Sequence, residues 1–215
     1  MKHKIYRIVC TALCCAPLLA TAQTGGKITS PQRLYEEGES LFRQKAFAAA
    51  MPPLQAFIKQ TDAEGAPVSA AGNKEEAEYM LVCAEYELRN PNSIEWLREY
   101  LDTYPDTPHA NRICALIASA YFFEGKYDDA LAMFNSSRLD LLSNEERDDM
   151  TYRLATCYLK TGNVKEAAIW FETLRSTSSR YTADCTYYLA YIRYSQQRYD
   201  DALSGFLSLQ DLSLI

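Results

Sequence analysis

The stretch from Leu154 to Leu174, LATCYLKTGNVKEAAIWFETL, decides the fold of this 215-residue chain. Apolar residues recur at helical spacing in both halves of the stretch, and Gly162 with Asn163 interrupts the pattern between them. The stretch therefore predicts two antiparallel helices joined by a tight turn. Ala155 and Ala167 are small residues, one in each helix, at the predicted crossing, so the two backbones can approach closely there.

The same spacing returns along the chain. Counted from Leu154, the marked offsets are one (small), four (aromatic), eight (glycine), ten (apolar), thirteen (alanine), seventeen (phenylalanine) and twenty (apolar). A copy that starts at Ile117 is nearly complete, and one that starts at Leu189 departs only near its turn. A moderate match is headed by Glu37, and a looser one lies between residues 76 and 104. The unit therefore occurs about five times.

Three alanines fix the period of this repeat. Ala130, Ala167 and Ala202 hold the alanine position in successive copies, 37 and 35 residues apart, and a Tyr-Asp-Asp-Ala run ends at the first and at the third. That period is typical of helix-turn-helix solenoids. On these residues the chain resembles the tetratricopeptide repeat family over roughly residues 31–210. The resemblance implies an all-α fold, a right-handed solenoid of about five antiparallel hairpins. The alternative is a non-repeating helical bundle whose residues match by chance.

Prolines and caps mark the helix boundaries. Pro52 and Pro53 lie in the second helix of the first copy, so that helix should kink there or begin late. Residues 90–92, Asn-Pro-Asn, predict a shortened turn in the second copy. Ser143 followed by Glu146 predicts a capping box at the start of the fourth copy.

Residues 1–22 have the pattern of a secretory signal peptide. Basic residues precede an apolar run of 13 residues, from Ile8 to Ala20, and Ala-Thr-Ala then forms a small-x-small cleavage site. The run is too short to span a bilayer, and no later one reaches about 18 residues, so we expect no integral membrane segment after cleavage. Residues 23–30 are expected to form a flexible N-terminus. The protein is thus predicted to be exported, to the periplasm or the cell envelope.

Two further features lie in the leader and within the repeat domain. Cys14 and Cys15 suggest an alternative, in which one of these cysteines is lipid-modified. Leu13, however, occupies a place where that signal usually has a small residue. Thr61–Lys74 is rich in Ala, Gly and Pro without an apolar period, which predicts an inserted loop.

Residues 211–215 form an apolar tail directly after the fifth copy. A solenoid needs a polar outer face on its last repeat, because an apolar one would otherwise lie open to water. We therefore expect further repeats or a partner to cover the C-terminal face. The alternative is a frayed apolar tail.

Charge and cysteines restrict the class of partner. Removing the leader leaves 19 basic and 28 acidic residues, a net charge of −9, so the chain is not built to hold nucleic acid. An even count of four cysteines in an oxidising compartment permits disulfides. Buried thiols are favoured, because each cysteine lies within a predicted first helix, and the absence of a CxxC pair argues against zinc. The four are Cys83, Cys114, Cys157 and Cys185.

The residues give little support for catalysis. His109 is the single histidine after the leader, so no histidine pair can bind a metal or serve a triad. The glycines never form a phosphate-binding loop. Carboxylate pairs such as Asp128-Asp129 lie at predicted helix starts, where they complement the helix dipole. We expect no enzyme activity, no cofactor and no metal.

The resemblance implies that the first helices line a concave groove for an extended peptide or a partner helix. Tyrosine suits such a surface because its ring is large and rigid with a polar tip. Tyr187 and Tyr191 are equally compatible with the core, and Tyr121 and Tyr158 are expected to pack between hairpins. The lysine and asparagine set with which some family members hold a terminal carboxylate is missing here. The candidate groove residues are Ser119, Phe122, Tyr152, Thr156, Leu159, Lys160, Tyr187, Tyr191 and Tyr194.

The sequence thus predicts an exported scaffold or adaptor that binds a protein or peptide and performs no catalysis. A second hypothesis is a surface glycan- or peptide-binding receptor component of a nutrient-uptake system, since tyrosine rings can stack on sugars. A third hypothesis is a catalytic role, although the sequence contains none of the common catalytic patterns.

Overall fold

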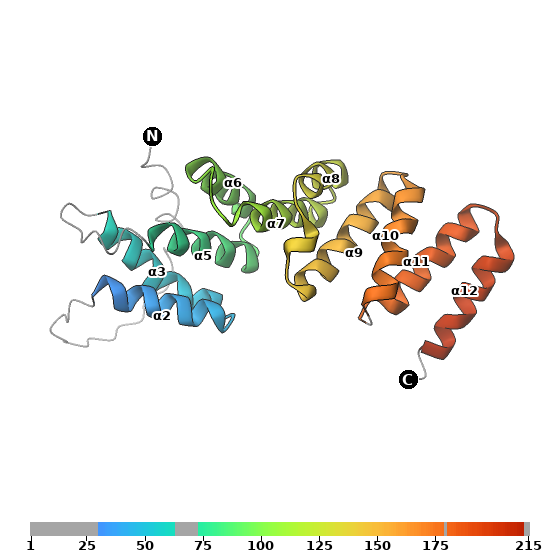
Figure 1. Cartoon of the computed structure of the whole chain (residues 1–215), viewed down its shortest axis with the longest axis horizontal. Helices are drawn as coiled ribbons and strands as arrows, with labels where there is room; N and C mark the ends of the chain where they lie inside the picture. Colours follow the sequence, from blue (N-terminus) through green and yellow to red (C-terminus); the bar gives the residue numbers. More distant parts are fainter. Residues whose placement is uncertain (1–29, 63–72, 179, 213–215) are drawn as a thin grey trace. The chain divides into compact units, whose positions relative to one another are not determined.

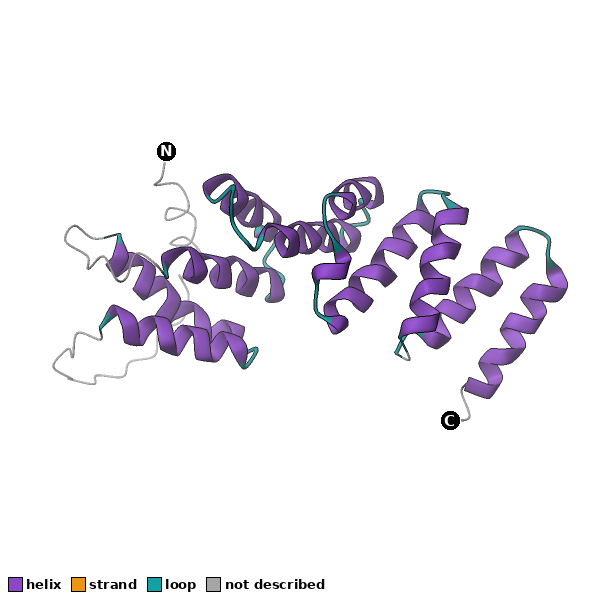
Figure 2. Cartoon of the chain, in the orientation of Figure 1, coloured by secondary structure: helices purple, strands orange, loops and turns teal. Residues whose placement is uncertain are grey.

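The structure, a computed structural model, describes residues 30–62, 73–178 and 180–212. Within them the chain forms ten α-helices and one short 3-10 helix and contains no strand, which confirms the predicted all-α fold (Figure 2). The expected signal peptide, most of the expected inserted loop and residues 213–215 lie outside the described ranges. No helix in those ranges combines the length and apolarity needed to cross a membrane.

The helices divide between two compact units, residues 1–110 and 111–215 (Figure 1). In the first unit α2 pairs with α3, α5 pairs with α6, and α3 also contacts α5. In the second unit α10 contacts both α9 and α11, and α11 contacts α12. The helices of the first unit are α2 (Pro31–Arg43), α3 (Phe47–Thr61), α5 (Lys74–Glu87) and α6 (Ser93–Thr103). Those of the second are α7 (Ala110–Phe123), α8 (Tyr127–Asn135), η2 (Leu139–Leu141), α9 (Asn144–Lys160), α10 (Val164–Thr177), α11 (Thr182–Ser195) and α12 (Tyr199–Leu212).

The small residues of the repeat lie at the helix crossings, as predicted. A Cβ atom added to Gly38 would lie 2.6 Å from Leu54 Cγ, and one added to Gly205 would lie 2.8 Å from Ala190 Cβ. Larger side chains fill the space beside each crossing, with Phe171 fully buried between α9 and α11. The alanines at the two small positions are all at most 1% exposed: Ala118, Ala155 and Ala190 in the first helices, and Ala130, Ala167 and Ala202 in the second.

Each hairpin closes with the same turn. In the fourth hairpin the Gly162 N–H donates to the Leu159 carbonyl (3.2 Å) and the Asn163 N–H donates to the Tyr158 carbonyl (2.8 Å). These are the two hydrogen bonds of a Schellman motif, which requires one residue in the left-handed region. The same pair of bonds recurs in all five turns. The left-handed residues are Lys45 (φ 59°), Arg89 (59°), Gly125 (74°), Gly162 (82°) and Gln197 (63°).

Exchanging the residues at two of these turns should change stability in opposite directions. A side chain in the left-handed region costs on the order of 1 kcal/mol, whereas glycine adopts it freely. We expect Gly162→Gln to lower the free energy of unfolding by about 1 kcal/mol and Gln197→Gly to raise it by about 0.5 kcal/mol, the gain being smaller because glycine also loosens the unfolded chain. Urea unfolding of both variants measures this. Equal signs for the two exchanges would contradict the equivalence of the turns.

One of the two alternatives predicted for the proline-containing helix is excluded, and the predicted short turn was wrong. α3 begins at Phe47 and contains both Pro52 and Pro53, so it does not begin late. The helix tolerates two missing donors because it packs against α2 on one side and α5 on the other. In the second hairpin α6 begins four residues after the left-handed Arg89, whereas the other second helices begin two residues after theirs, so this turn is longer rather than shorter.

Side-chain hydrogen bonds explain the longer turn and the capped helix starts. Asn90 donates from Nδ2 to Glu85 Oε2 (3.0 Å) and accepts at Oδ1 from the Asn92 N–H (3.1 Å), which stabilises the extra residues. The predicted capping box is confirmed: Ser143 Oγ accepts from the Glu146 N–H (3.4 Å), and the Ser143 hydroxyl donates to Glu146 Oε2 (2.8 Å).

Candidate functional site

The nine residues predicted to line a groove differ in burial. Ser119 (0% exposed) and Thr156 (5%) are buried, so neither offers open surface to a ligand, contrary to expectation. Half-buried residues are Phe122, Tyr152 and Leu159, and exposed residues are Lys160, Tyr187, Tyr191 and Tyr194. The three tyrosines of the fifth hairpin are 47%, 48% and 57% exposed. Of the two positions left open between groove and core, Tyr187 and Tyr191 therefore lie on the surface.

Ser119 is buried by the first helix of the next hairpin. Arg153 on α9 donates from Nη1 to Ser119 Oγ (2.5 Å), and its guanidinium lies 4.9 Å from the ring centroid of Phe123. The same guanidinium lies 3.9 Å from an Asp149 carboxylate oxygen. Sequence analysis missed Arg153, although an arginine between apolar positions of a first helix is a signal that the side chain reaches across to a neighbour.

Tyr152 is likewise held by packing. Its ring stacks on that of Tyr181 at 4.8 Å with an interplanar angle of 18°, and the Tyr181 hydroxyl donates to Asp149 Oδ1 (2.7 Å). Burial raises the pKa of Tyr152, and burial together with the bond to Asp149 raises the pKa of Tyr181 to about 12. Both rings therefore stay neutral and join α9 to the start of α11.

The fifth hairpin exposes two repeat positions that earlier hairpins bury. Tyr191 (48% exposed) occupies the position held by Ser119 and Thr156, and Leu203 (58%) occupies the position of Leu131 (9%). We define the C-terminal face as six exposed residues of α11 and α12: Tyr187, Tyr191, Tyr194, Tyr199, Leu203 and Leu207. Two of its rings, Tyr194 and Tyr199, meet edge to face at 5.5 Å. The face therefore runs from one helix onto the other.

The C-terminal face is large for a free surface. Aromatic side chains bury about 200 Å² each, so six large side chains that are each about half exposed leave on the order of 600 Å² open. That is at the upper end of the largest patch on a typical monomer, and such patches mark interaction sites.

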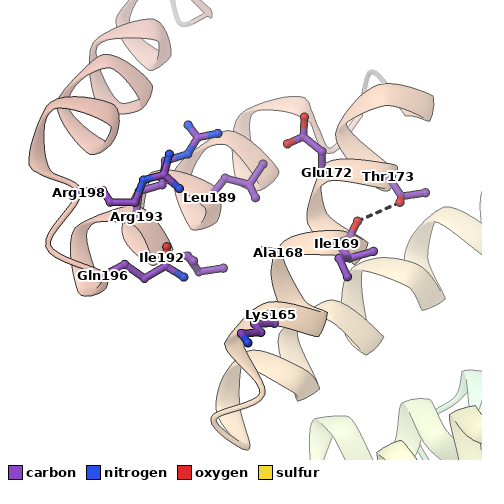
Figure 3. A pocket seen from close by; sticks show the side chains of 10 residues that line it. All are labelled: Lys165, Ala168, Ile169, Glu172, Thr173, Leu189, Ile192, Arg193, Gln196 and Arg198. Carbon is purple, nitrogen blue, oxygen red and sulfur yellow. Dashed lines mark hydrogen bonds between the residues drawn. The ribbon is translucent and has the colours of Figure 1, made fainter.

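A groove of about 600 Å³ lies between α10 and α11 and reaches the start of α12 (Figure 3). Leu189 and Ile192 are its buried apolar residues on α11, and Ile169 (64% exposed) stands on α10. Figure 3 shows residues of α10 facing those of α11 across the hollow. Charged side chains line the groove as well: Lys165, Glu172, Arg193 and Arg198. The groove suits an apolar side chain with a polar neighbour, and its lining residues include no histidine or cysteine.

A second hollow on α12 repeats one wall of this groove. Its lining residues are Asp200, Leu203, Ser204, Leu207 and Ser208. Each lies 35 residues after a residue of the α10 wall, namely Lys165, Ala168, Ile169, Glu172 and Thr173. Across the residues that the structure describes, α12 has no helix in the place that α11 takes beside α10.

The chain is similar to known proteins in sequence over one segment and in fold over most of its length. Residues 116–181 match the tetratricopeptide repeat family. The described helices also share their fold with solved MamA structures. MamA of AMB-1 is 17% identical with a TM-score of 0.64, covering 85% of this chain and 91% of that one. MamA of Desulfovibrio magneticus RS-1 is 12% identical with a TM-score of 0.61, covering 86% and 96%. No curated protein sequence matches the chain.

In the described ranges no three histidine, cysteine or carboxylate side chains come together to hold a metal ion. In the first unit the His109 ring stacks on Tyr79 at 3.6 Å, and its Nε2 lies 2.7 Å from Glu76 Oε2. His109 therefore packs on α5 within the first unit.

Three cysteines, Cys83, Cys157 and Cys185, are buried, as favoured above, whereas Cys114 is half-buried. Cys157 and Cys185 are fully buried, and burial raises the pKa of each thiol to about 12. The thiolate is the reactive form, so we expect neither residue to react with a thiol reagent in the folded protein at pH 8. Labelling followed by mass spectrometry, with and without urea, tests this. Rapid labelling of Cys157 in the folded protein would show that the core of the fourth hairpin opens.

Proposed function

We propose that this protein is an exported scaffold or adaptor that binds another protein through its helical hairpins and performs no catalysis. The observation that carries the proposal is the C-terminal face, six large exposed residues, of which Tyr191 and Leu203 hold repeat positions that earlier hairpins bury. The tetratricopeptide repeat match over residues 116–181 and the fold shared with MamA support it. Export rests on the leader pattern in residues 1–22, which predicts the periplasm or the cell envelope as the working place.

The composition of the face suits a protein partner. Tyrosine is enriched among residues that dominate binding energy, because a rigid ring gives large contact area at small entropic cost. The face carries four tyrosines and two leucines and no charge of its own. A partner surface of apolar and aromatic residues would match it.

Cross-linking in cells tests the proposal. A photo-reactive residue at Tyr191 should capture a protein from the cell envelope, whereas the same residue at Glu166, an exposed charged position on α10, should capture little. Leu203→Asp should reduce the Tyr191 cross-link at least about tenfold, because a carboxylate would then be desolvated in the contact. The adaptor role is refuted if the two probe positions give the same products.

A surface glycan or peptide receptor is the second proposal, favoured by the three exposed rings of α11. Tyr187, Tyr191 and Tyr194 lie at intervals of four and three residues on one helix. Calorimetry against a panel of glycans measures it directly. Heat of binding that disappears in Tyr191→Ala would favour the receptor over the adaptor.

A further inference from the structure

We propose that the C-terminal face receives the first helix of another antiparallel hairpin of the same repeat type, supplied by the protein partner. The incoming helix would lie on α12 in the position that α11 takes on α10. This inference rests on the proposed function and names the partner's chemistry: a helical hairpin with an apolar first helix.

The hollows beside α10 and on α12 indicate which kind of element would cover the C-terminal face. The α10–α11 groove has one wall on α10 and the other on α11. The hollow on α12 repeats the α10 wall residue by residue, with Leu203 in place of Ala168 and Leu207 in place of Glu172. The missing wall therefore corresponds to a first helix like α11.

Burial along the second helices is the second argument. Phe134 (3% exposed) and Phe171 (0%) are covered in the third and fourth hairpins, while the equivalent Phe206 is half-buried. Leu174 (1%) is covered and its equivalent Leu209 is half-buried. The fifth hairpin has apolar residues at both positions, although both are partly exposed to water there. In the third and fourth hairpins, the hairpin that follows covers the equivalent residues.

The first described helix, α2, argues against a second copy stacked head to tail as the occupant. Residues that pack a first helix against the preceding hairpin are buried and mostly apolar in α9 and α11: Met150, Leu154, Cys157, Cys185, Leu189 and Ile192. The equivalent residues of α2 are Arg33, Glu37 and Ser40, all exposed. Docking α2 on the C-terminal face would bury Arg33 and Glu37 against leucine, which costs several kcal/mol per unpaired charge. The described face of α2 is polar at these positions, whereas the C-terminal face is apolar and aromatic.

The size of Tyr191 further specifies the incoming helix. In the third hairpin this position is Ser119, and its small side chain leaves room for Arg153 of the next helix at 2.5 Å. Tyr188 holds the Arg153 position in α11. A tyrosine at position 191 fills that room, so the partner helix should carry a small residue at the Arg153 position.

A hairpin added to the full chain tests the inference. The chain is extended after Leu212 with a second copy of residues 178–212, which keeps the 35-residue period, and the copy carries Tyr188→Ala to make room for Tyr191. We expect hydrogen exchange in α12 around Leu203 and Leu207 to slow by about tenfold or more, because the helix would then open only when the hairpin detaches.

In a matched control, the added copy carries at three positions the residues that α2 has at the equivalent positions. These substitutions, made in the added copy alone, are Cys185→Arg, Leu189→Glu and Ile192→Ser. It should leave α12 exchange within about twofold of the unextended chain. Equal protection by both copies, or by neither, would overturn the inference. A stable dimer of the unextended chain in light scattering, with α12 protected, would also overturn it, since a second copy would then occupy the face. Docking of the apolar copy without any cellular cross-link at Tyr191 would support the inferred geometry and refute the adaptor role.

Discussion

Replacing Phe171 with alanine should lower the free energy of unfolding by about 3–5 kcal/mol, the cost of removing a fully buried phenylalanine. The ring is 0% exposed and lies in the cluster that joins α9, α10 and α11. It stacks on Tyr188 at 4.9 Å and meets Tyr152 at 6.2 Å, so three helices lose contacts together. Chemical denaturation, followed by helical circular dichroism, measures the change.

Phe206→Ala is the matched control, because Phe206 holds the same repeat position in the fifth hairpin but is only half-buried. We expect it to cost about 1–2 kcal/mol, since burial of a ring scales with the area removed from water. Equal costs at the two positions would contradict the burial difference between the hairpins. In the chain extended with an apolar hairpin, the cost at Phe206 should rise toward that at Phe171.

Ala167→Leu should destabilise the protein by about 1–3 kcal/mol, although leucine is nearly as good a helix former as alanine. Ala167 is 0% exposed on α10 and belongs to the same buried cluster as the fully buried Ala155 of α9. Three added carbon atoms must push the helices apart or force a strained rotamer. The midpoint of urea unfolding should fall with little change in the slope.

The adjacent Ala168→Leu distinguishes crowding from a general effect of leucine. Ala168 is half-buried, and leucine already occupies the equivalent positions, as Leu131 in α8 and Leu203 in α12. This variant should change the free energy of unfolding by less than about 0.5 kcal/mol. A loss as large as that of Ala167→Leu would show that the crossing is not the constrained place.

Much of the fold was predictable because each feature rests on neighbours in sequence. Alanines at offsets of one and thirteen predicted the crossings, and these depend on backbone approach within one hairpin. Gly125 and Gly162 predicted the turns correctly. Gln197 shows that the turn does not need glycine, because two hydrogen bonds hold its left-handed conformation against a modest steric cost.

The candidate site was less predictable because its burial depends on the next hairpin. Ser119 is a small polar residue at a groove position, but Arg153, 34 residues later, covers it. Tyr187 and Tyr191 were equally compatible with core and surface, and they are exposed because the described residues place no hairpin beyond α12. The helix α3 continues through Pro52 for a similar reason: its packing on both sides outweighs a local backbone preference.

Contacts between successive helices also determine how the second unit should respond to mechanical tension. α10 contacts α9 and α11, and α11 contacts α12, so each helix is held mainly by the elements next to it in the chain. A force applied to the two ends of this unit would act on the contacts between successive helices one after another. The fifth hairpin, whose outer side has no neighbour among the described residues, should peel away first, and an extension trace should show stepwise release at intervals of one repeat.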